Sequence, residues 1–224
     1  MTISEQGEKP VRRIQQNILA VAERRLLNWL CCRLPAWVTP DLLTATGVAG
    51  ALVVFAGYAL SSLHGGWLWV AIGGLFIQWF GDSLDGSLAR YRKIERPFFG
   101  YFIDHSCDGI ATLLIAAGIG LSPYVRLDVA LICLAGYLLL SIHAFLSARV
   151  LSELVLSHAG AGPTELRLAL IALTVAMMVL GIQPRMWAAF SGFDLLVGAV
   201  GVALILLFVV QTLRTARRLM RLGN

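Results

Sequence analysis

Six long apolar stretches constrain this chain more than any other feature of its sequence. Each is about 20 residues long, the length that an α-helix needs to cross the hydrocarbon core of a bilayer. Of the 224 residues, 58% are hydrophobic and 14% are charged, a balance too apolar for a water-soluble domain of this size. The sequence therefore predicts an all-α integral membrane protein with a bundle of six transmembrane helices. The expected spans are residues 42–62, 66–88, 100–121, 127–150, 164–182 and 193–213.

The segment before the first span, residues 11–34, has apolar residues at helical spacing but too many charged ones to cross a membrane. Pro35 ends this segment. We expect an amphipathic helix at the cytoplasmic membrane interface, with its arginines among anionic lipid headgroups. A helix packed on the bundle is the alternative. The predicted organisation is a cytoplasmic tail with this surface helix over 1–37, followed by a six-helix membrane domain over 38–224.

Lysine and arginine are distributed very unevenly among the connections. All but two of the 18 fall in the N-terminal segment, in the connections after the second and fourth spans, or in the C-terminal tail. The exceptions are Arg126 and Arg185. Because cytoplasmic connections carry the excess of basic residues, both termini and the connection after the second span are expected in the cytoplasm. In a bacterial cell this membrane is the inner (plasma) membrane. The net charge of +5 then reports orientation, and a nucleic-acid partner is not expected.

Four aspartates interrupt the apolar pattern at the second and third spans. Carboxylates are costly in a membrane and mark a functional site there. Asp82 and Asp85 are three residues apart, and Asp104 and Asp108 are four apart, so each pair shares one helix face. Oxygen ligands without clustered His or Cys select a hard cation, first Mg²⁺ and second Mn²⁺. The spacing predicts a site between two helices for one or two divalent ions.

The residues around these acids indicate what the metal site handles. Gly86 and Ala89 leave room on the acidic face of their helix, and Gly100 does the same one turn before Asp104. Arg90, at the water boundary, suits a phosphate oxygen. Together these features indicate phosphoryl chemistry on a diphosphate. A divalent-cation transporter is the alternative of another class. It is disfavoured because an ion path has no use for an arginine beside its carboxylates, and because all four acids lie near one membrane face.

The acids and their neighbours form one motif, which resembles the signature of the CDP-alcohol phosphotransferase (CDP-alcohol phosphatidyltransferase) family with every defining position filled. The start of the first span, Thr39-Pro40-Asp41-x-x-Thr44, resembles the family too, except that Asp41 stands where members often have Asn. The motif reads Asp82-x-x-Asp85-Gly86-x-x-Ala89-Arg90, nine residues, then Gly100-x-x-x-Asp104-x-x-x-Asp108.

The resemblance implies a metal-dependent transferase of phospholipid synthesis. Such an enzyme displaces CMP from a CDP-linked alcohol with the hydroxyl of a second alcohol. By resemblance, Asp82, Asp85 and Asp104 are metal ligands. Asp108 is either a ligand to a second metal or the catalytic base. The positions implied to give the cytidine its space or to hold the diphosphate are Gly86, Ala89, Arg90, Asp82 and Gly100.

Two pairs of substrates fit the motif equally well. One is CDP-diacylglycerol with a small polar alcohol, and the other is a CDP-aminoalcohol with diacylglycerol. The first is slightly favoured because the chain is short and lacks the extra helices of the long aminoalcohol enzymes. The resemblance implies membrane lipids as partners, and members of the family often pair as homodimers. A noncatalytic scaffold descended from the family is disfavoured because no motif position is lost.

Three residues outside the signature have open roles. His105 follows Asp104 as in the choline and ethanolamine phosphotransferase branch and competes with Asp108 as the base, although its position next to Asp104 predicts that it points off the acidic face. Glu165 either faces the cavity or favours the start of the fifth span. Arg149 either binds a phosphorylated acceptor or reaches the headgroups. Family members that use phosphorylated acceptors usually carry more basic residues near this position. This chain offers only Arg149 and Arg167 there, which favours an unphosphorylated acceptor.

Overall fold

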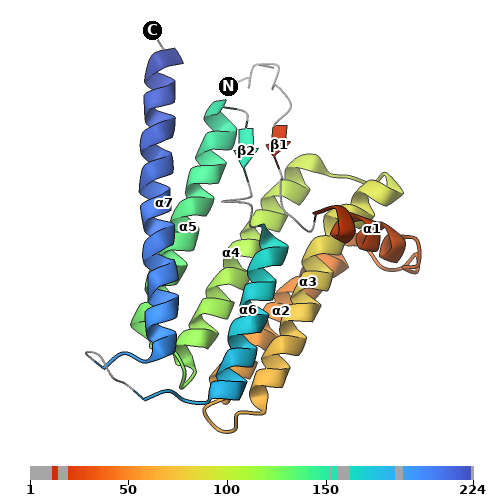
Figure 1. Ribbon diagram of the computed structural model, residues 1–224. Coiled ribbons are helices and arrows are strands. Elements are labelled where there is room, and N and C mark those ends of the chain that lie inside the picture. The colour runs from red at the N-terminus through yellow and green to blue at the C-terminus, as the bar shows by residue number, and fades with distance from the viewer. Residues whose placement is uncertain (1–11, 15–19, 152, 156–161, 185–188, 223–224) are drawn as a thin grey trace, which may run out of the picture.

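The computed structural model describes residues 12–14, 20–151, 153–155, 162–184 and 189–222, and this part of the chain is almost wholly helical (Figure 1). Two three-residue strands, β1 (Arg12–Ile14) and β2 (Glu153–Val155), pair in parallel. Because these strands are so short and nearly all other described residues are helical, the predicted all-α fold class is confirmed. The helices are α1 (Ala20–Cys31), α2 (Pro40–Leu60), α3 (Trp67–Arg92), α4 (Pro97–Leu121), α5 (Leu127–Leu151), α6 (Pro163–Leu180) and α7 (Gly192–Leu222).

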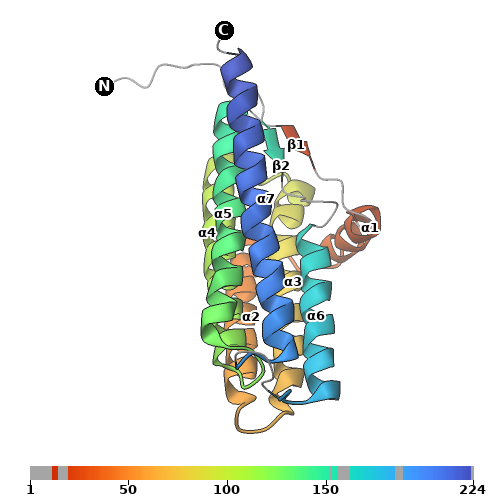
Figure 2. The same ribbon diagram turned by 60° about the vertical axis from the view of Figure 1, so that its left-hand side comes forward.

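Helices α2 to α7 follow the six predicted spans closely, with α7 running on to Leu222. Five of them, α2, α4, α5, α6 and α7, are long and apolar enough to cross a membrane, so the protein is a multi-pass membrane protein. The 26-residue helix α3 falls short of that measure, because Gln78, Asp82 and Asp85 interrupt its apolar sequence. The count of six spans therefore stays a prediction. Helix α3 packs along α2 within the bundle (Figures 1 and 2).

Glycines bring α2 and α3 into backbone contact. A Cβ atom on Gly50 would overlap the backbone nitrogen of Gln78 in α3. A Cβ atom on Gly81 would overlap the backbone of α2 at Gly47 and Leu43. Small residues allow such close approach in membrane bundles, where dispersion forces rather than the hydrophobic effect hold helices together. The acidic end of α3 is thereby held directly against the start of α2.

Helix α1 packs against α3 beside this acidic end, at the edge of the bundle and transverse to the long helices (Figure 1). Its Leu27 and Cys31 are buried in a cluster with Leu84 and Leu88 of α3. The opposite side of α1 exposes apolar side chains. Its placement on a membrane surface stays a prediction, whereas its packing on the bundle is observed. The exposed apolar residues of α1 are Val21, Leu26 and Trp29.

The predicted extent of the first helix, residues 11–34, is wrong at its start. Arg12–Ile14 is extended, because its backbone pairs with Glu153–Val155. That partner segment is remote in sequence, so periodicity within residues 11–34 carries no sign of the pairing. Residues 1–11 and 15–19 lie outside the described part of the chain.

Polar contacts join the helices at both ends of the bundle. At the acidic end, Glu23 Oε1 of α1 accepts hydrogen bonds from Trp79 Nε1 of α3 at 3.0 Å and from Thr164 Oγ1 of α6 at 2.7 Å. At the other end, the buried Asp194 of α7 accepts hydrogen bonds from the backbone N–H groups of Ser191 and Arg126, both at 2.7 Å. The contacts to Asp194 satisfy free backbone donors just before α5, at Arg126, and just before α7, at Ser191.

Candidate functional site

The four predicted acids line one pocket between α2, α3 and α4. It contains about 240 Å³ of space free of atoms, part of it open to solvent. The tertiary structure thus brings the two acidic pairs together, as their spacing on two helices predicted. The pocket is lined by Thr44, Gly47, Val48, Gln78, Asp82, Asp85, Asp104, Cys107, Asp108 and Ala111.

Asp85 is the most deeply buried of the four acids that line the pocket, with 8% of its surface exposed. Both carboxylate oxygens have a donor: Thr44 Oγ1 donates to Oδ2 at 2.7 Å, and the Gly86 N–H donates to Oδ1 at 2.5 Å. A buried charge needs such partners, which here also set the plane of the carboxylate. Thr44 was not among the predicted site residues. A signal existed, because it lies one turn into the first span beside the Thr39-Pro40-Asp41 start.

Asp82 forms an ion pair with Arg167 of α6. The same guanidinium donates from Nε to Gln78 Oε1 at 2.7 Å, so Arg167 contacts two residues that line the pocket. Sequence reasoning used Arg167 as an orientation marker and as one of the few basic residues near Arg149, but not as a partner of Asp82. Asp82 and Arg167 are 85 positions apart in sequence, and no local pattern connects them.

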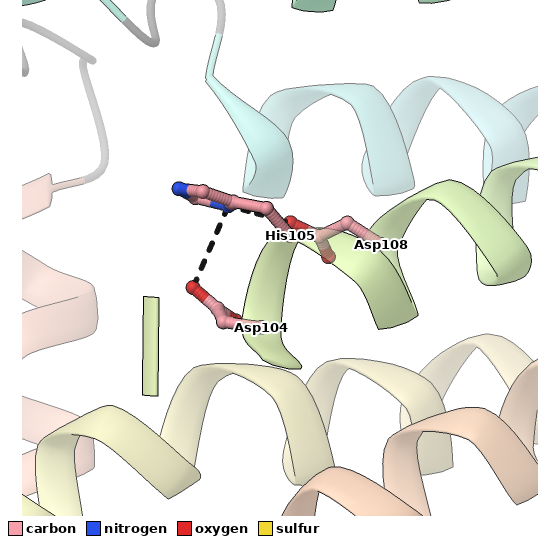
Figure 3. Close-up of side chains that lie close together, drawn as sticks. All are labelled: Asp104, His105 and Asp108. Carbon is pink, nitrogen blue, oxygen red and sulfur yellow. Dashed lines mark ion pairs between the residues drawn. The ribbon is translucent and has the colours of Figure 1, made fainter. Parts of the chain in front are cut away.

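Asp104, His105 and Asp108 form the second cluster of the site (Figure 3). The imidazole Nδ1 of His105 lies 3.7 Å from Asp104 Oδ2 and 3.6 Å from Asp108 Oδ2. One ligand atom from each of the three residues lies within 4.8 Å of the others. His105 does not line the pocket, in agreement with the expectation that it points off the acidic face, but its ring turns so that Nδ1 faces both carboxylates.

Aromatic neighbours account for this orientation of His105. Its ring centroid lies 4.3 Å from that of Tyr101 in an edge-to-face contact and 5.0 Å from that of Phe145 in α5. Edge-to-face packing is the favoured geometry for such rings. The ring is held from one side by aromatic carbon, and its Nδ1 is directed at the acids.

The predicted nucleotide positions other than Asp82 lie at the ends of α3 and α4, beyond the residues that line the pocket. Gly86 faces the guanidinium of Arg90, whose Nη1 would lie 3.3 Å from a Cβ atom there. Arg90 is exposed and donates to Ser87 Oγ at 3.3 Å. Ala89 is half-buried, and Gly100 faces open space. The surface beside the acids is thus open at Gly100, whereas at Gly86 the long side chain of Arg90 covers it.

Two further residues are placed by α5 and α6. Glu165 Oε2 accepts a hydrogen bond from the Gly162 N–H at 3.0 Å, as the helix-start interpretation predicted. Arg149 lies in the last turn of α5.

The donor set of the pocket fits a hard divalent cation. Four carboxylates from two helices line one small space, and the groups of Asp104, His105 and Asp108 lie close enough to share one ion. Carboxylate oxygens are the ligands that Mg²⁺ and Mn²⁺ prefer. Without a cation, clustered carboxylates repel one another, so the arrangement itself favours binding a positive charge.

Comparisons with known proteins agree with the motif. A family model described as CDP-alcohol phosphatidyltransferase matches residues 37–211. The chain is 30% identical to cholinephosphotransferase 1 of Danio rerio, over 48% of this chain and 32% of that protein. It is 37% identical to phosphatidylinositol phosphate synthase of Cutibacterium acnes, over 39% of this chain and 40% of that protein.

A third relative is archaeal. The chain is 35% identical to archaetidylinositol phosphate synthase of Methanothermobacter thermautotrophicus, over 45% of this chain and 49% of that protein. The matched part of the chain thus spans between about a third and a half of the length of these relatives.

Proposed function

The chain belongs to the CDP-alcohol phosphatidyltransferase family, and we propose that it is a membrane enzyme of phospholipid synthesis that releases CMP from a CDP-linked donor. The phosphoalcohol group of the donor passes to the hydroxyl of an acceptor alcohol. One observation carries the proposal: Asp82, Asp85, Asp104 and Asp108 of the signature line a single pocket. These acids come from two helices but share one space, which is the arrangement that a site for a metal-bound diphosphate requires.

The four acids are proposed to hold one or two divalent ions, Mg²⁺ or Mn²⁺. Bound there, such an ion neutralises charge on the diphosphate oxygens as CMP departs. Thr44 and the Gly86 N–H orient the Asp85 carboxylate before any ligand arrives. A carboxylate fixed in advance spends no free energy on reorganisation during the reaction.

Asp108 is the proposed base. The acceptor oxygen forms a new bond to the phosphorus of the phosphoalcohol group, the bond from that phosphorus to the CMP oxygen breaks, and the acceptor proton passes to the Asp108 carboxylate. His105 is the alternative base, supported by the approach of its Nδ1 to Asp104 and Asp108. A base within hydrogen-bond reach contributes roughly 10²–10⁴ in rate.

The nucleotide is proposed to bind at the pocket mouth. Gly86 and Ala89 supply space on α3, and Gly100 supplies it on α4, where nothing lies within 4 Å of a Cβ position. The exposed guanidinium of Arg90 is proposed to swing from Gly86 to a phosphate oxygen. A surface arginine has little to hold it in place, and its planar fork matches phosphate geometry.

The donor is proposed to be CDP-diacylglycerol and the acceptor a small polar alcohol. The synthases of phosphatidylinositol phosphate and archaetidylinositol phosphate among the relatives support this choice. The alternative, a CDP-aminoalcohol with diacylglycerol, is supported by the cholinephosphotransferase relatives and by His105. The active site and both termini are proposed to face the cytoplasm, because the basic residues favour that orientation.

The test is CMP release by the purified protein in lipid with Mg²⁺. The donors are CDP-diacylglycerol and CDP-choline, and the acceptors are inositol, glycerol, serine, their phosphates and diacylglycerol. We expect release with one donor and acceptor pair, and its loss when EDTA removes the metal. Release that survives EDTA would refute the metal assignment. Absence of both CMP release and CDP binding would refute the transferase and favour a noncatalytic scaffold or a cation path.

A further inference from the structure

Arg167 connects α6 to the acidic pocket through contacts that the proposed reaction does not use. Its guanidinium pairs with Asp82 and donates from Nε to Gln78 Oε1 at 2.7 Å. The side chains of Arg167 and Asp82 are 11% and 21% exposed, so the pair is largely removed from water. Charge-assisted hydrogen bonds are among the stronger polar contacts of a protein, and low solvent exposure reduces their screening.

This pairing conflicts with the role proposed for Asp82. The Oδ2 atom that accepts from Arg167 belongs to a carboxylate assigned to the metal. A divalent cation and a guanidinium beside the same carboxylate repel each other, and a lone pair used for one is not available to the other. A metal ion bound through Oδ2 has to displace Arg167, and one bound through Oδ1 has the guanidinium charge beside it, so in either case Arg167 opposes the metal.

We propose that Arg167 is a built-in counter-ion that competes with the divalent cation for Asp82, so that metal binding releases the ion pair between Arg167 of α6 and Asp82 of α3. The proposal rests on the proposed function, because that function assigns Asp82 to the metal. Arg167 is a positioning residue in this scheme and does not contact the reacting atoms. In the unloaded enzyme it neutralises one acid of the repulsive group.

The release is local to the Arg167 side chain. The start of α6 is held independently, since Thr164 donates to Glu23 at 2.7 Å and Glu165 accepts from the Gly162 N–H at 3.0 Å. Loss of the Arg167 contacts therefore leaves α6 attached to α1 and to its own first turn. The freed guanidinium remains beside Gln78 at the pocket edge.

The test is direct binding of Mn²⁺, followed by electron paramagnetic resonance, with neither donor nor acceptor present. Arg167→Gln keeps a long polar side chain but removes the charge. We expect it to bind Mn²⁺ about tenfold more tightly than the unmodified protein, because a charge-assisted hydrogen bond no longer opposes the metal. Arg96→Gln is the matched control. It removes an arginine paired with Asp41, which does not line the pocket, and should change the affinity less than twofold.

A second variant covers failure of Arg167→Gln to fold. Gln78→Leu keeps all four acids and Arg167 but removes the acceptor that orients the guanidinium, so a smaller gain in Mn²⁺ affinity is expected. Equal or weaker binding in the folded variants, with Mn²⁺ bound normally by the unmodified protein, overturns the competition and leaves the proposed function standing. No Mn²⁺ binding and no CMP release by the unmodified protein overturn both.

Discussion

The four acids of the pocket have different neighbours, and these neighbours suit the acids to different roles in binding a metal ion or a substrate. Asp85 is buried and oriented by Thr44, whereas Asp82 is paired with Arg167. Asp104 and Asp108 are more exposed and share His105. A buried, fully bonded carboxylate is suited to fixed ligation, and a more exposed one is suited to meeting substrate. Single substitutions should therefore separate metal binding from structural support.

Asp104→Asn should lower CMP release by at least about 100-fold, because a neutral amide binds a hard cation far less well than a carboxylate. Expression and thermal unfolding should be unchanged, since Asp104 is not buried. Asp41→Asn is the matched control, with the same chemical change at an exposed acid paired with Arg96 outside the pocket. Near-normal turnover by Asp104→Asn would refute its role as a ligand.

Thr44→Val should reduce Mn²⁺ affinity about tenfold, because Asp85 loses the hydroxyl donor that holds Oδ2 at 2.7 Å. Thr44→Ser keeps the hydroxyl and should restore most of the affinity. The comparison is made by Mn²⁺ titration of the two purified variants. Equal affinity of Val and Ser variants would show that the hydrogen bond does not support the metal site.

Helix α3 carries half of the acids and depends on its contact with α2. The two helices meet backbone to backbone because glycines stand on both surfaces. This contact brings Thr44 of α2 within hydrogen-bond distance of Asp85 of α3. The glycines thus contribute to the site by allowing the close approach of α2 and α3, although they have no side chain that could bind a ligand.

Gly81→Ala should destabilise the protein by about 1–3 kcal/mol, because the added methyl group overlaps rigid backbone of α2. Gly73→Ala is the matched control on the same helix, where a Cβ atom meets nothing within 4 Å. The measurement is thermal unfolding in one detergent. A Gly81→Ala protein as stable as Gly73→Ala would contradict the close approach of α2 and α3.

Ala89→Leu tests the proposed nucleotide surface of α3. The larger side chain should weaken CDP binding about tenfold or more by occupying the space proposed for the cytidine, while Ala89 is only half-buried and the fold should tolerate the change. This estimate follows from the cost of overfilling a packed contact. Calorimetry with CDP gives the affinity, and thermal unfolding gives the control. Unchanged affinity would exclude Ala89 from the nucleotide site.

Successive membrane helices run in opposite directions, so the acidic end of α3, the start of α4 and the end of α5 lie at one end of the bundle (Figure 1). The connections richest in basic residues lie at the same end. A site for a charged nucleotide beside the cytoplasm and a lipid substrate within the bilayer are compatible with this arrangement. The orientation of the whole molecule therefore decides which compartment supplies the nucleotide.

Orientation is tested with single cysteines in a variant lacking the four native ones. Glu95→Cys lies between α3 and α4 and should react with a membrane-impermeant maleimide only after the cells are opened. His64→Cys lies between α2 and α3 and should react in intact cells. Both positions are exposed, so access to the reagent is the variable measured. The reverse pattern would place the site on the outer side.

Much of the fold was predictable from individual segments. Apolar length located α2 to α7, and the spacing of Asp82, Asp85, Asp104 and Asp108 correctly indicated two faces that converge. The extended Arg12–Ile14 segment was predicted wrongly because its partner is remote in sequence. The predicted boundary at residue 37, between the cytoplasmic tail with its surface helix and the membrane domain, stays a prediction. The roles of the site residues also stay predictions.

The sequence by itself determined the membrane class, the approximate extents of α2 to α7 and the helix face that carries each acidic pair, because hydropathy and helical spacing are local properties. Only the tertiary structure decided which neighbours each acid has. Thr44, Arg167 and His105 acquire their roles through contacts between helices or through packing on α5, where distances in space are unrelated to distances along the chain. The positions of the carboxylates follow from the sequence, whereas their geometry and their contacts arise from the packing of the bundle.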